Sequence, residues 1–297
     1  MERCYTLDNK LVIPDTIEGL LVTELDTYTL SQTVRRREQP PAKREGEPEM
    51  CGEALEELTL PKYLEKVGAY AFYNCFHLKK LSCCSTVRDW GAGVFTGCTQ
   101  INHLDIRIFP EEKSSFKEIL SELRQMLVVD YRDEEGKLLA KLIFPEFFEE
   151  GVENTPARIL ENHVHGSGIR YRNSFVHKKI NTLEYDRLFP YAVAWEQERI
   201  VLNLALDRIL YPVSMTDEAK EKYLIYIKEH IQQAIRLLGE QKAYDSMQRI
   251  LRKLAPDRAE TEKMLETAQS ANDSRCVSIL MNELQKHGRK QRKAFEL

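Results

Sequence analysis

The chain has 297 residues, of which 42% are hydrophobic and 30% are charged, so its composition is that of a folded protein rather than a disordered or membrane-spanning one. Its 43 basic and 47 acidic residues give a formal net charge of −4, which provides no overall positive field for nucleic acid or an anionic membrane. The 7 cysteines are scattered and odd in number, so reduced thiols are expected instead of a disulfide framework.

The N-terminal segment, MERCYTLDNKLVIP, contains neither the apolar stretch nor the small-residue cleavage site of a secretory signal. No uncharged apolar run approaches the roughly 18 residues that a membrane span needs. We therefore expect a cytoplasmic protein that has neither a membrane nor a nucleic acid as its partner.

Two consecutive copies of a 23-residue repeat occupy the stretch from Leu58 to Leu104. The apolar and glycine positions of the first copy recur as apolar or glycine residues 23 positions later, and Gly68 thus matches Gly91. Such a period indicates a solenoid in which equivalent side chains form ladders inside the coil. The glycines mark positions that need either positive φ or a close backbone approach. The expected core positions are Leu58, Leu60, Val67, Phe72, Cys75, Leu78, Leu81, Trp90, Phe95, Cys98, Ile101 and Leu104.

The first copy, LPKYLEKVGAYAFYNCFHLKKL, resembles the BspA-like (Treponema-type) leucine-rich repeat family, whose pattern is LPxxLxxIGxxAFxxCxxLxxL. The second copy departs from this pattern at Cys84, Trp90 and Val94, and an upstream partial copy is expected in NKLVIPDTIEGLLVTELDTYTLSQ. The resemblance implies protein binding and no catalysis. Members of this family also occur on bacterial surfaces, where they bind host proteins, but the missing signal favours the cytosol here.

Residues 33–50, TVRRREQPPAKREGEPEM, interrupt the array between the partial copy and the first full copy. Their charge and proline content predicts a disordered surface insertion, because such a segment buries little apolar surface. The insertion contains a basic cluster that could bind an acidic partner, although a solvated loop is the simpler interpretation. The cluster consists of Arg35, Arg36, Arg37, Lys43 and Arg44.

Residues 111–150 are expected to form a cap that covers the apolar end of the solenoid. Ser115 and Glu118 predict a capping box at the start of a helix whose apolar positions extend to Leu127. The runs MLVVDY and LLAKLIF then predict a β-hairpin with Gly136 in its turn.

The densest polar group lies in ENHVHGSGIRYRNSFVH, residues 161–177, and allows three interpretations. In the first, His163 and His165 point the same way from an extended strand and bind a metal together with Glu161 or His177. Such a site would suit a metal-dependent hydrolase.

In the second interpretation, Gly166 and Gly168 allow the backbone to form an anion nest, to which Arg170 and Arg172 add positive charge. In the third, the segment is a buried turn whose histidines and arginines hydrogen-bond to backbone carbonyls. No metal or cofactor is assigned. The candidate partner or anion site consists of His163, His165, Ser167, Arg170, Arg172 and His177.

Beyond Pro156 nearly all of the chain is expected to be helical. Thr216 marks the start of one helix, and Asp257 with Glu260 predicts a capping box at another. A shift of 33 residues takes Ala243 to Cys276 and Met247 to Leu280, a spacing similar to that of ankyrin repeats, although the threonine-proline-leucine-histidine signature of that family is missing.

Together these patterns predict an α+β fold: a short leucine-rich repeat solenoid with a helix and β-hairpin cap, followed by an all-α helical array. The expected domains are 1–110 for the solenoid with its insertion, 111–150 for the cap and 151–297 for the array of ankyrin-like helix pairs. The expected function is a non-catalytic cytosolic adaptor that binds another protein. The alternative is a metal-dependent hydrolase with its site around His163, His165 and His177.

Overall fold

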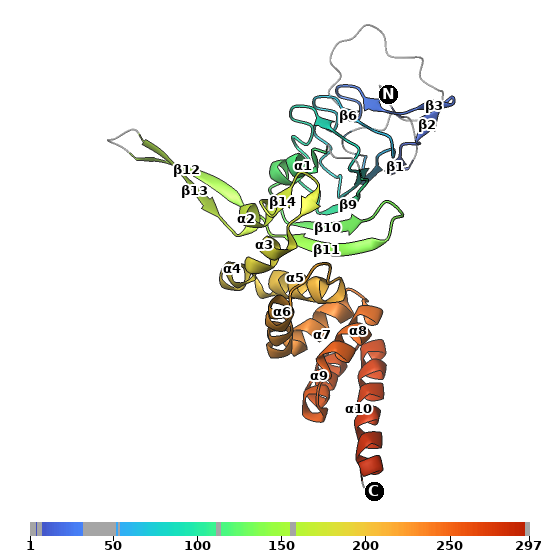
Figure 1. Ribbon diagram of the computed structural model, residues 1–297, viewed down its shortest axis with the longest axis vertical. Coiled ribbons are helices and arrows are strands. Elements are labelled where there is room, and N and C mark those ends of the chain that lie inside the picture. The colour runs from blue at the N-terminus through green and yellow to red at the C-terminus, as the bar shows by residue number, and fades with distance from the viewer. Residues whose placement is uncertain are drawn as a thin grey trace. The chain divides into compact units, whose positions relative to one another are not determined.

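Two compact units divide the chain, Met1–Glu196 and Gln197–Leu297, here called the N-terminal and C-terminal units (Figure 1). The predicted insertion at 33–50 lies outside the described residues, and only the backbone is described for 152–154, 159–162 and 287–294. The computed structural model describes residues 4, 8–31, 52, 54–110, 114–154 and 159–294.

The N-terminal unit contains a β-solenoid of about three turns, residues 57–132, in which the 23-residue period becomes the register between neighbouring strands. Leu58 pairs with Leu81, and Leu81 pairs with Leu104, always in parallel. These strands belong to a six-stranded sheet of order β1-β5-β7-β9-β10-β11. Its repeat strands are β5 (Glu57–Thr59), β7 (Lys80–Cys84) and β9 (His103–Arg107).

The twelve core positions expected from the repeat are all buried. The rings of Phe72 and Phe95 pack at a tilt of 51° with their centroids 5.7 Å apart, and the thiols of Cys75 and Cys98 donate hydrogen bonds to backbone carbonyls of Leu30 and Phe72. A small thiol at this position therefore satisfies a carbonyl of an earlier turn while filling the interior of the coil.

A second, three-stranded sheet forms another side of the coil from β4 (Glu24–Leu25), β6 (Lys66–Val67) and β8 (Asp89–Trp90). The glycines that follow β6 and β8 are needed here for close approach and not for positive φ. A Cβ on Gly68 would lie 2.5 Å from the carbonyl carbon of Asp26, and one on Gly91 would lie 2.5 Å from that of Gly68.

The upstream partial copy contributes strands to both sheets of the solenoid, ahead of the first full repeat. Strand β1 (Lys10–Val12) pairs in parallel with β5, and β4 pairs in parallel with β6 at an offset of 42 residues, since Leu25 lies opposite Val67. A short hairpin of β2 (Thr16–Ile17) and β3 (Leu20–Leu21) lies between β1 and β4. The predicted partial copy is thus confirmed by these strand pairings.

The cap contains the predicted hairpin of β10 (Leu127–Arg132) and β11 (Leu138–Phe144), with Gly136 at a φ of 88° in the turn. Strand β10 continues the sheet in parallel with β9, and β11 closes it in the antiparallel direction. Helix α1 (Phe116–Glu122) precedes the hairpin, so the helix expected to reach Leu127 ends five residues earlier, and Leu127 is the first residue of β10.

The capping box predicted at Ser115 and Glu118 is wrong. Ser115 is the N-cap of α1, but its hydroxyl makes no capping bond and instead donates to the carbonyl of Val87 in the last coil. At the other end of α1, the carboxylate of Glu122 accepts the backbone N–H of Phe95 at 3.4 Å. Both side chains thus form hydrogen bonds with backbone groups at the edge of the last coil, which a further turn would otherwise pair with.

The residues after the cap are less helical than expected. Strands β12 (Phe148–Asn154) and β13 (Ile159–His165) form a separate antiparallel ribbon, which extends away from the solenoid within this unit (Figure 1). The remaining elements are α2 (Gly168–Arg172), β14 (Phe175–Val176), β15 (Lys179–Ile180), α3 (Thr182–Arg187) and α4 (Phe189–Trp195).

The C-terminal unit is entirely helical within the described residues. The hydroxyl of Thr216 caps α6, and Asp257 with Glu260 forms the predicted capping box of α9. None of the helices that the structure describes has the length and apolarity that a membrane crossing requires. The helices are α5 (Glu198–Leu210), α6 (Asp217–Glu229), α7 (Ile231–Glu240), α8 (Tyr244–Leu254), α9 (Arg258–Ser270) and α10 (Ser274–Ala294).

The turns before α8 and α10 repeat after 30 residues, whereas the sequence predicted a shift of 33. Lys242 and Asn272 both have a φ of 54°, and the next residue in each turn bonds back to a helix carbonyl. The two shifts differ by three residues, close to one helical turn, so both place buried residues on the same helix face. Helix periodicity by itself therefore left the alignment ambiguous.

Candidate functional site

The six predicted site residues all lie in the N-terminal unit, but the structure distributes them over three places. The ribbon strand β13 has His163 and His165, the region around α2 has Ser167, Arg170 and Arg172, and the turn between β14 and β15 has His177.

The ribbon histidines have the extended geometry that the metal interpretation requires. In the register of β12 with β13, His163 lies opposite Glu150 and His165 lies opposite Phe148. Both histidines are exposed, and they share a face because alternate residues of a strand point the same way. The Nε2 atom of His165 lies 3.0 Å from Oε2 of Glu150, and its ring stacks on Phe148 with 4.5 Å between centroids.

A complete metal-ligand set does not accompany this pair in the part of the chain that the structure describes, where no group of three or more His, Cys, Asp or Glu is placed to hold a metal. His177 lies in the turn of the separate β14–β15 hairpin, with a φ of 55°. The side chain of Glu161 lies outside the described residues. The structure therefore does not bring His177 to the pair as the predicted third ligand.

Arg172 is not part of an external anion site, and the second interpretation is wrong for this residue. Its side chain is only 1% exposed, and burial lowers the pKa of Arg172 to about 10. The guanidinium lies over the ring of Phe147, 4.9 Å from its centroid. All its polar atoms donate to backbone carbonyls, as the third interpretation expected, and the acceptors are the carbonyl oxygens of Leu120, Leu123, Gln125, Pro145 and Gly168.

Ser167 does bind a carboxylate, but that carboxylate belongs to Glu196 of the same chain. Its backbone N–H and its hydroxyl both donate to Oε1 of Glu196, at 2.8 and 2.6 Å. The neighbouring glycines are needed for two reasons: Gly166 has a φ of 84°, which side chains rarely allow, and a Cβ on Gly168 would lie 2.1 Å from the carbonyl oxygen of Pro145. The buried Ser167 thus fixes the end of α4 to the start of α2.

Of Ser167, Arg170 and Arg172, only Arg170 is exposed. It lies beside two aromatic side chains that were not among the predicted site residues. Its guanidinium carbon is 5.1 Å from the ring centroid of Tyr191 and 5.5 Å from that of Trp195. Both aromatic residues lie on α4 at a spacing of four, with 5.4 Å between their rings. The spacing in YAVAW was a usable signal, but nothing in the sequence indicated that α2 would supply an arginine.

These three residues, Arg170, Tyr191 and Trp195, are here called the Trp195 surface. Tyr191 is 43% exposed and Trp195 is 53% exposed, although large aromatic side chains usually bury most of their area. Tryptophan, tyrosine and arginine are the residue types that contribute most to binding energy at protein interfaces. The composition and exposure of this surface are therefore those of a protein-binding site.

The outer face of the solenoid sheet contains a second polar group, formed by neighbouring strands β9 and β10. Nε2 of His103 lies 3.2 Å from Oδ2 of Asp130, and Arg132 bonds both Asp130 and Asp105. Burial acts to raise the pKa of Asp130, but His103, Lys141 and Arg132 outweigh it and lower the pKa overall. Arg132 thus links the two carboxylates, while Oδ1 of Asp130 is buried without a hydrogen-bond partner among the described residues.

Comparison with known proteins gives one match. A family model described as a BspA type leucine rich repeat region (6 copies) matches residues 49–123, which include the repeat strands β5, β7 and β9 and helix α1. No curated protein and no solved structure matches the chain. Leucine-rich repeats generally mediate interactions between proteins. The N-terminal part of this chain is a leucine-rich repeat solenoid of the BspA type.

Proposed function

We propose that this protein is a non-catalytic cytosolic adaptor that holds another protein, with the Trp195 surface as the anchor. The observation that carries the proposal is the exposed arginine, tyrosine and tryptophan group of the Trp195 surface in the same compact unit as a repeat of the protein-binding kind. Burying a side chain of this size at an interface contributes about 2 kcal/mol or more when it acts as a hot spot.

The Trp195 surface is also ordered without a bound partner. Glu196 follows Trp195 directly and is bound by two hydrogen bonds from Ser167, while α4 begins with Pro190 in its first turn. An anchor that is already ordered loses little conformational entropy on binding. The arrangement therefore favours recognition of a protein surface with a pocket for the indole ring.

The test is an affinity capture from native cytosol with the full-length chain and two variants of α4. Trp195→Ala removes the anchor, and Val193→Ala is the matched control, because Val193 is 43% exposed against 53% for Trp195 but lies two residues away on a different face of the helix. We expect a protein that the intact chain and the control retain, and whose capture falls by about tenfold or more with Trp195→Ala.

Retention of the same proteins by all three chains would contradict the proposal, as would the absence of any protein specific to the intact chain. Circular dichroism and thermal unfolding of each variant separate loss of the surface from loss of the fold. An exposed substitution of this kind is expected to change stability by only about 0.5 kcal/mol.

A further inference from the structure

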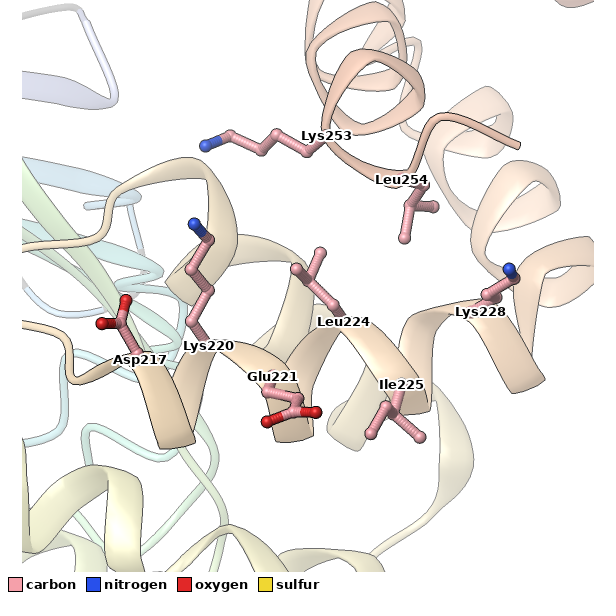
Figure 2. Close-up of a pocket in the computed structure, with 8 residues that line it drawn as sticks. All are labelled: Asp217, Lys220, Glu221, Leu224, Ile225, Lys228, Lys253 and Leu254. Carbon is pink, nitrogen blue, oxygen red and sulfur yellow. The ribbon is translucent and has the colours of Figure 1, made fainter. Parts of the chain in front are cut away.

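Two features outside the Trp195 surface are open to a further partner. The first is a groove of about 350 Å³ in the C-terminal unit, between α6 and the end of α8 (Figure 2). Asp217 and Glu221 line it together with three lysines, so its charges select no occupant. The second is the β12–β13 ribbon of the N-terminal unit, and the sequence of this ribbon does select one.

Each strand of the ribbon has one edge without a partner strand. Strands β12 and β13 pair with each other from Phe148 opposite His165 to Asn154 opposite Ile159. Within the part of the chain that the structure describes, no third strand joins them, and the ribbon extends away from the solenoid (Figure 1). An isolated two-stranded hairpin is at best marginally stable in water. A further strand along one of the free edges would therefore stabilise the ribbon.

The free edge of β13 lacks the usual protection against strand pairing. Exposed sheet edges are commonly protected by proline, by lysine or by a β-bulge. Strand β13 reads ILENHVH, without proline or lysine, and its register with β12 is regular. Val164 is 46% exposed, although β-branched side chains in sheets are usually packed against neighbours. This edge is thus suited to receive another strand.

The sequence of β13 is complementary to itself when a second copy runs antiparallel to it. A two-fold axis through Asn162 makes every pairing reciprocal between the two copies. Leu160 then lies opposite Val164, apolar against apolar. Glu161 lies opposite His163, acidic against basic. Pairs of these two kinds, directly opposite one another, stabilise antiparallel strands.

Other self-pairings of the ribbon bring like groups together. On β12, an axis through Gly151 places Glu149 opposite Glu153. On β13, moving the axis to Glu161 or to His163 sets that ionisable residue against its own copy. Like charges directly opposite one another destabilise a strand pair. Charge therefore favours the β13 edge over the β12 edge, and it favours the register centred between these two β13 residues.

We propose that the free edge of β13 pairs with the same strand of a second copy of this chain, so that two ribbons form one four-stranded antiparallel sheet. In this sheet, Val164 is covered by Leu160 of the other copy. Seven residues per strand form a small interface beside the roughly 800 Å² per partner of a standard stable complex. We therefore expect a reversible dimer that forms at high protein concentration and leaves the ribbon uncovered in dilute solution. The dimer needs no other protein, so this inference goes beyond the adaptor function and does not depend on it.

The first experiment is sedimentation velocity of the purified full-length chain at concentrations from about 1 to 200 μM. The intact chain is expected to shift from monomer to dimer over this range. Glu161→Lys sets a cation opposite His163 twice in each dimer, and it is expected to raise the dimer Kd by about tenfold or more. An intact chain that stays monomeric, or equal dimerisation of the intact chain and Glu161→Lys, overturns the proposal.

The matched control is Glu153→Lys, which makes the same change of charge on β12 of the same ribbon. It is expected to leave the dimer Kd within about twofold of that of the intact chain. Equal weakening by both variants would show a general effect of charge. Stronger dimerisation by Glu153→Lys would assign the contact to the β12 edge, and either result overturns the β13 pairing.

A mixture of two variants tests the register directly. His163→Glu sets a glutamate opposite Glu161, so this variant alone is expected to dimerise as poorly as Glu161→Lys alone. In a mixed dimer of the two variants, one pair is lysine with glutamate and the other is the unaltered pair of Glu161 with His163. Mixing is therefore expected to restore dimerisation. Failure of the mixture to associate overturns the register, and damage to either ribbon cannot produce the recovery, because each ribbon is the same alone and mixed.

Hydrogen exchange of the intact chain at low and high concentration locates the contact. Amides of β13 are expected to gain protection at the concentration at which the dimer forms, and Glu161→Lys is expected to abolish this gain. Protection that appears in other segments but not in β13 would place the dimer contact elsewhere and overturn the proposal.

Discussion

Arg172 shows how strongly one residue can depend on its surroundings. Arginine beside glycine in a polar segment suggests a site for an external anion, yet this guanidinium is enclosed by backbone carbonyls of α1, of the chain after β11 and of α2. A cation buried without a carboxylate is tolerated because carbonyl oxygens accept all its donors. The residue joins the cap to the segment that positions the Trp195 surface.

Replacing this residue is expected to destabilise the N-terminal unit substantially. Arg172→Met removes the donors to several buried carbonyl oxygens, and each carbonyl left without another donor costs about 1–3 kcal/mol. Arg170→Met, two residues away and exposed, is the control and is expected to cost no more than about 1 kcal/mol. Urea unfolding of both variants measures the difference, and equal midpoints would contradict the structural role of Arg172.

Asp273 gives a prediction for the dependence of stability on pH. Its pKa is lowered from 3.8, chiefly because its carboxylate accepts the backbone N–H and the thiol of Cys276. A group whose pKa is lower in the folded state stabilises the fold above its unfolded pKa and loses this contribution as the pH falls through the folded value. We therefore expect a loss of stability below about pH 3.8 that Asp273→Asn reduces.

The measurement is the free energy of unfolding of the intact chain and of Asp273→Asn at several pH values below and above that pKa. The two curves are expected to converge at low pH, where Asp273 is protonated. If the variant loses as much stability on acidification as the intact chain, then this carboxylate makes no contribution.

At the scale of the element, the starts of two helices show when a local sequence pattern predicts a capping box correctly and when it does not. Both Ser115 with Glu118 and Asp257 with Glu260 have the spacing of a capping box, and only the second pair forms one. The hydroxyl of Ser115 instead donates a hydrogen bond to the carbonyl of Val87, because α1 starts against the last coil of the solenoid. A carbonyl of a neighbouring element competes for the same side chain.

The intact capping box makes a prediction for α9. Asp257→Ala removes the acceptor for the N–H of Glu260 and is expected to cost about 1 kcal/mol, whereas Asp257→Asn keeps an acceptor and is expected to cost less. Thermal or urea unfolding of the two variants provides the comparison. Equal losses would mean that the charge of Asp257, rather than its hydrogen bond, supports the helix.

At the scale of the whole molecule, the strands differ in how they are supported. Strand β7 lies between β5 and β9, and its inward side chains Leu81 and Cys83 are buried. Within the part of the chain that the structure describes, strands β12 and β13 pair only with each other, and Phe148 and Val164 are about half exposed. Local stability follows burial and backbone pairing.

Hydrogen exchange followed by mass spectrometry of the full chain tests this ranking. Amides of β7 and β9 are expected to exchange slowest among the strands, and those of the β12–β13 ribbon fastest. Protection of the ribbon equal to that of β7 would contradict the order and would indicate that the ribbon is covered in solution.

The sequence by itself determined the repeat, its ladder of buried positions, the presence of an upstream partial copy and the helices of the C-terminal unit. These features arise from local periodicity: a residue 23 positions later meets the same environment, so side-chain type alone identifies it. The α+β class followed from the same patterns.

Only the tertiary structure decided the candidate site. The carbonyls around Arg172 include that of Leu120, which lies 52 residues earlier, and the carboxylate bound to Ser167 lies 29 residues later. The rings beside Arg170 likewise come from another helix. No periodic pattern links such residues, because their meeting depends on how the cap, α2 and α4 pack, and packing of distant segments is set by burial and hydrogen-bond satisfaction over the whole unit.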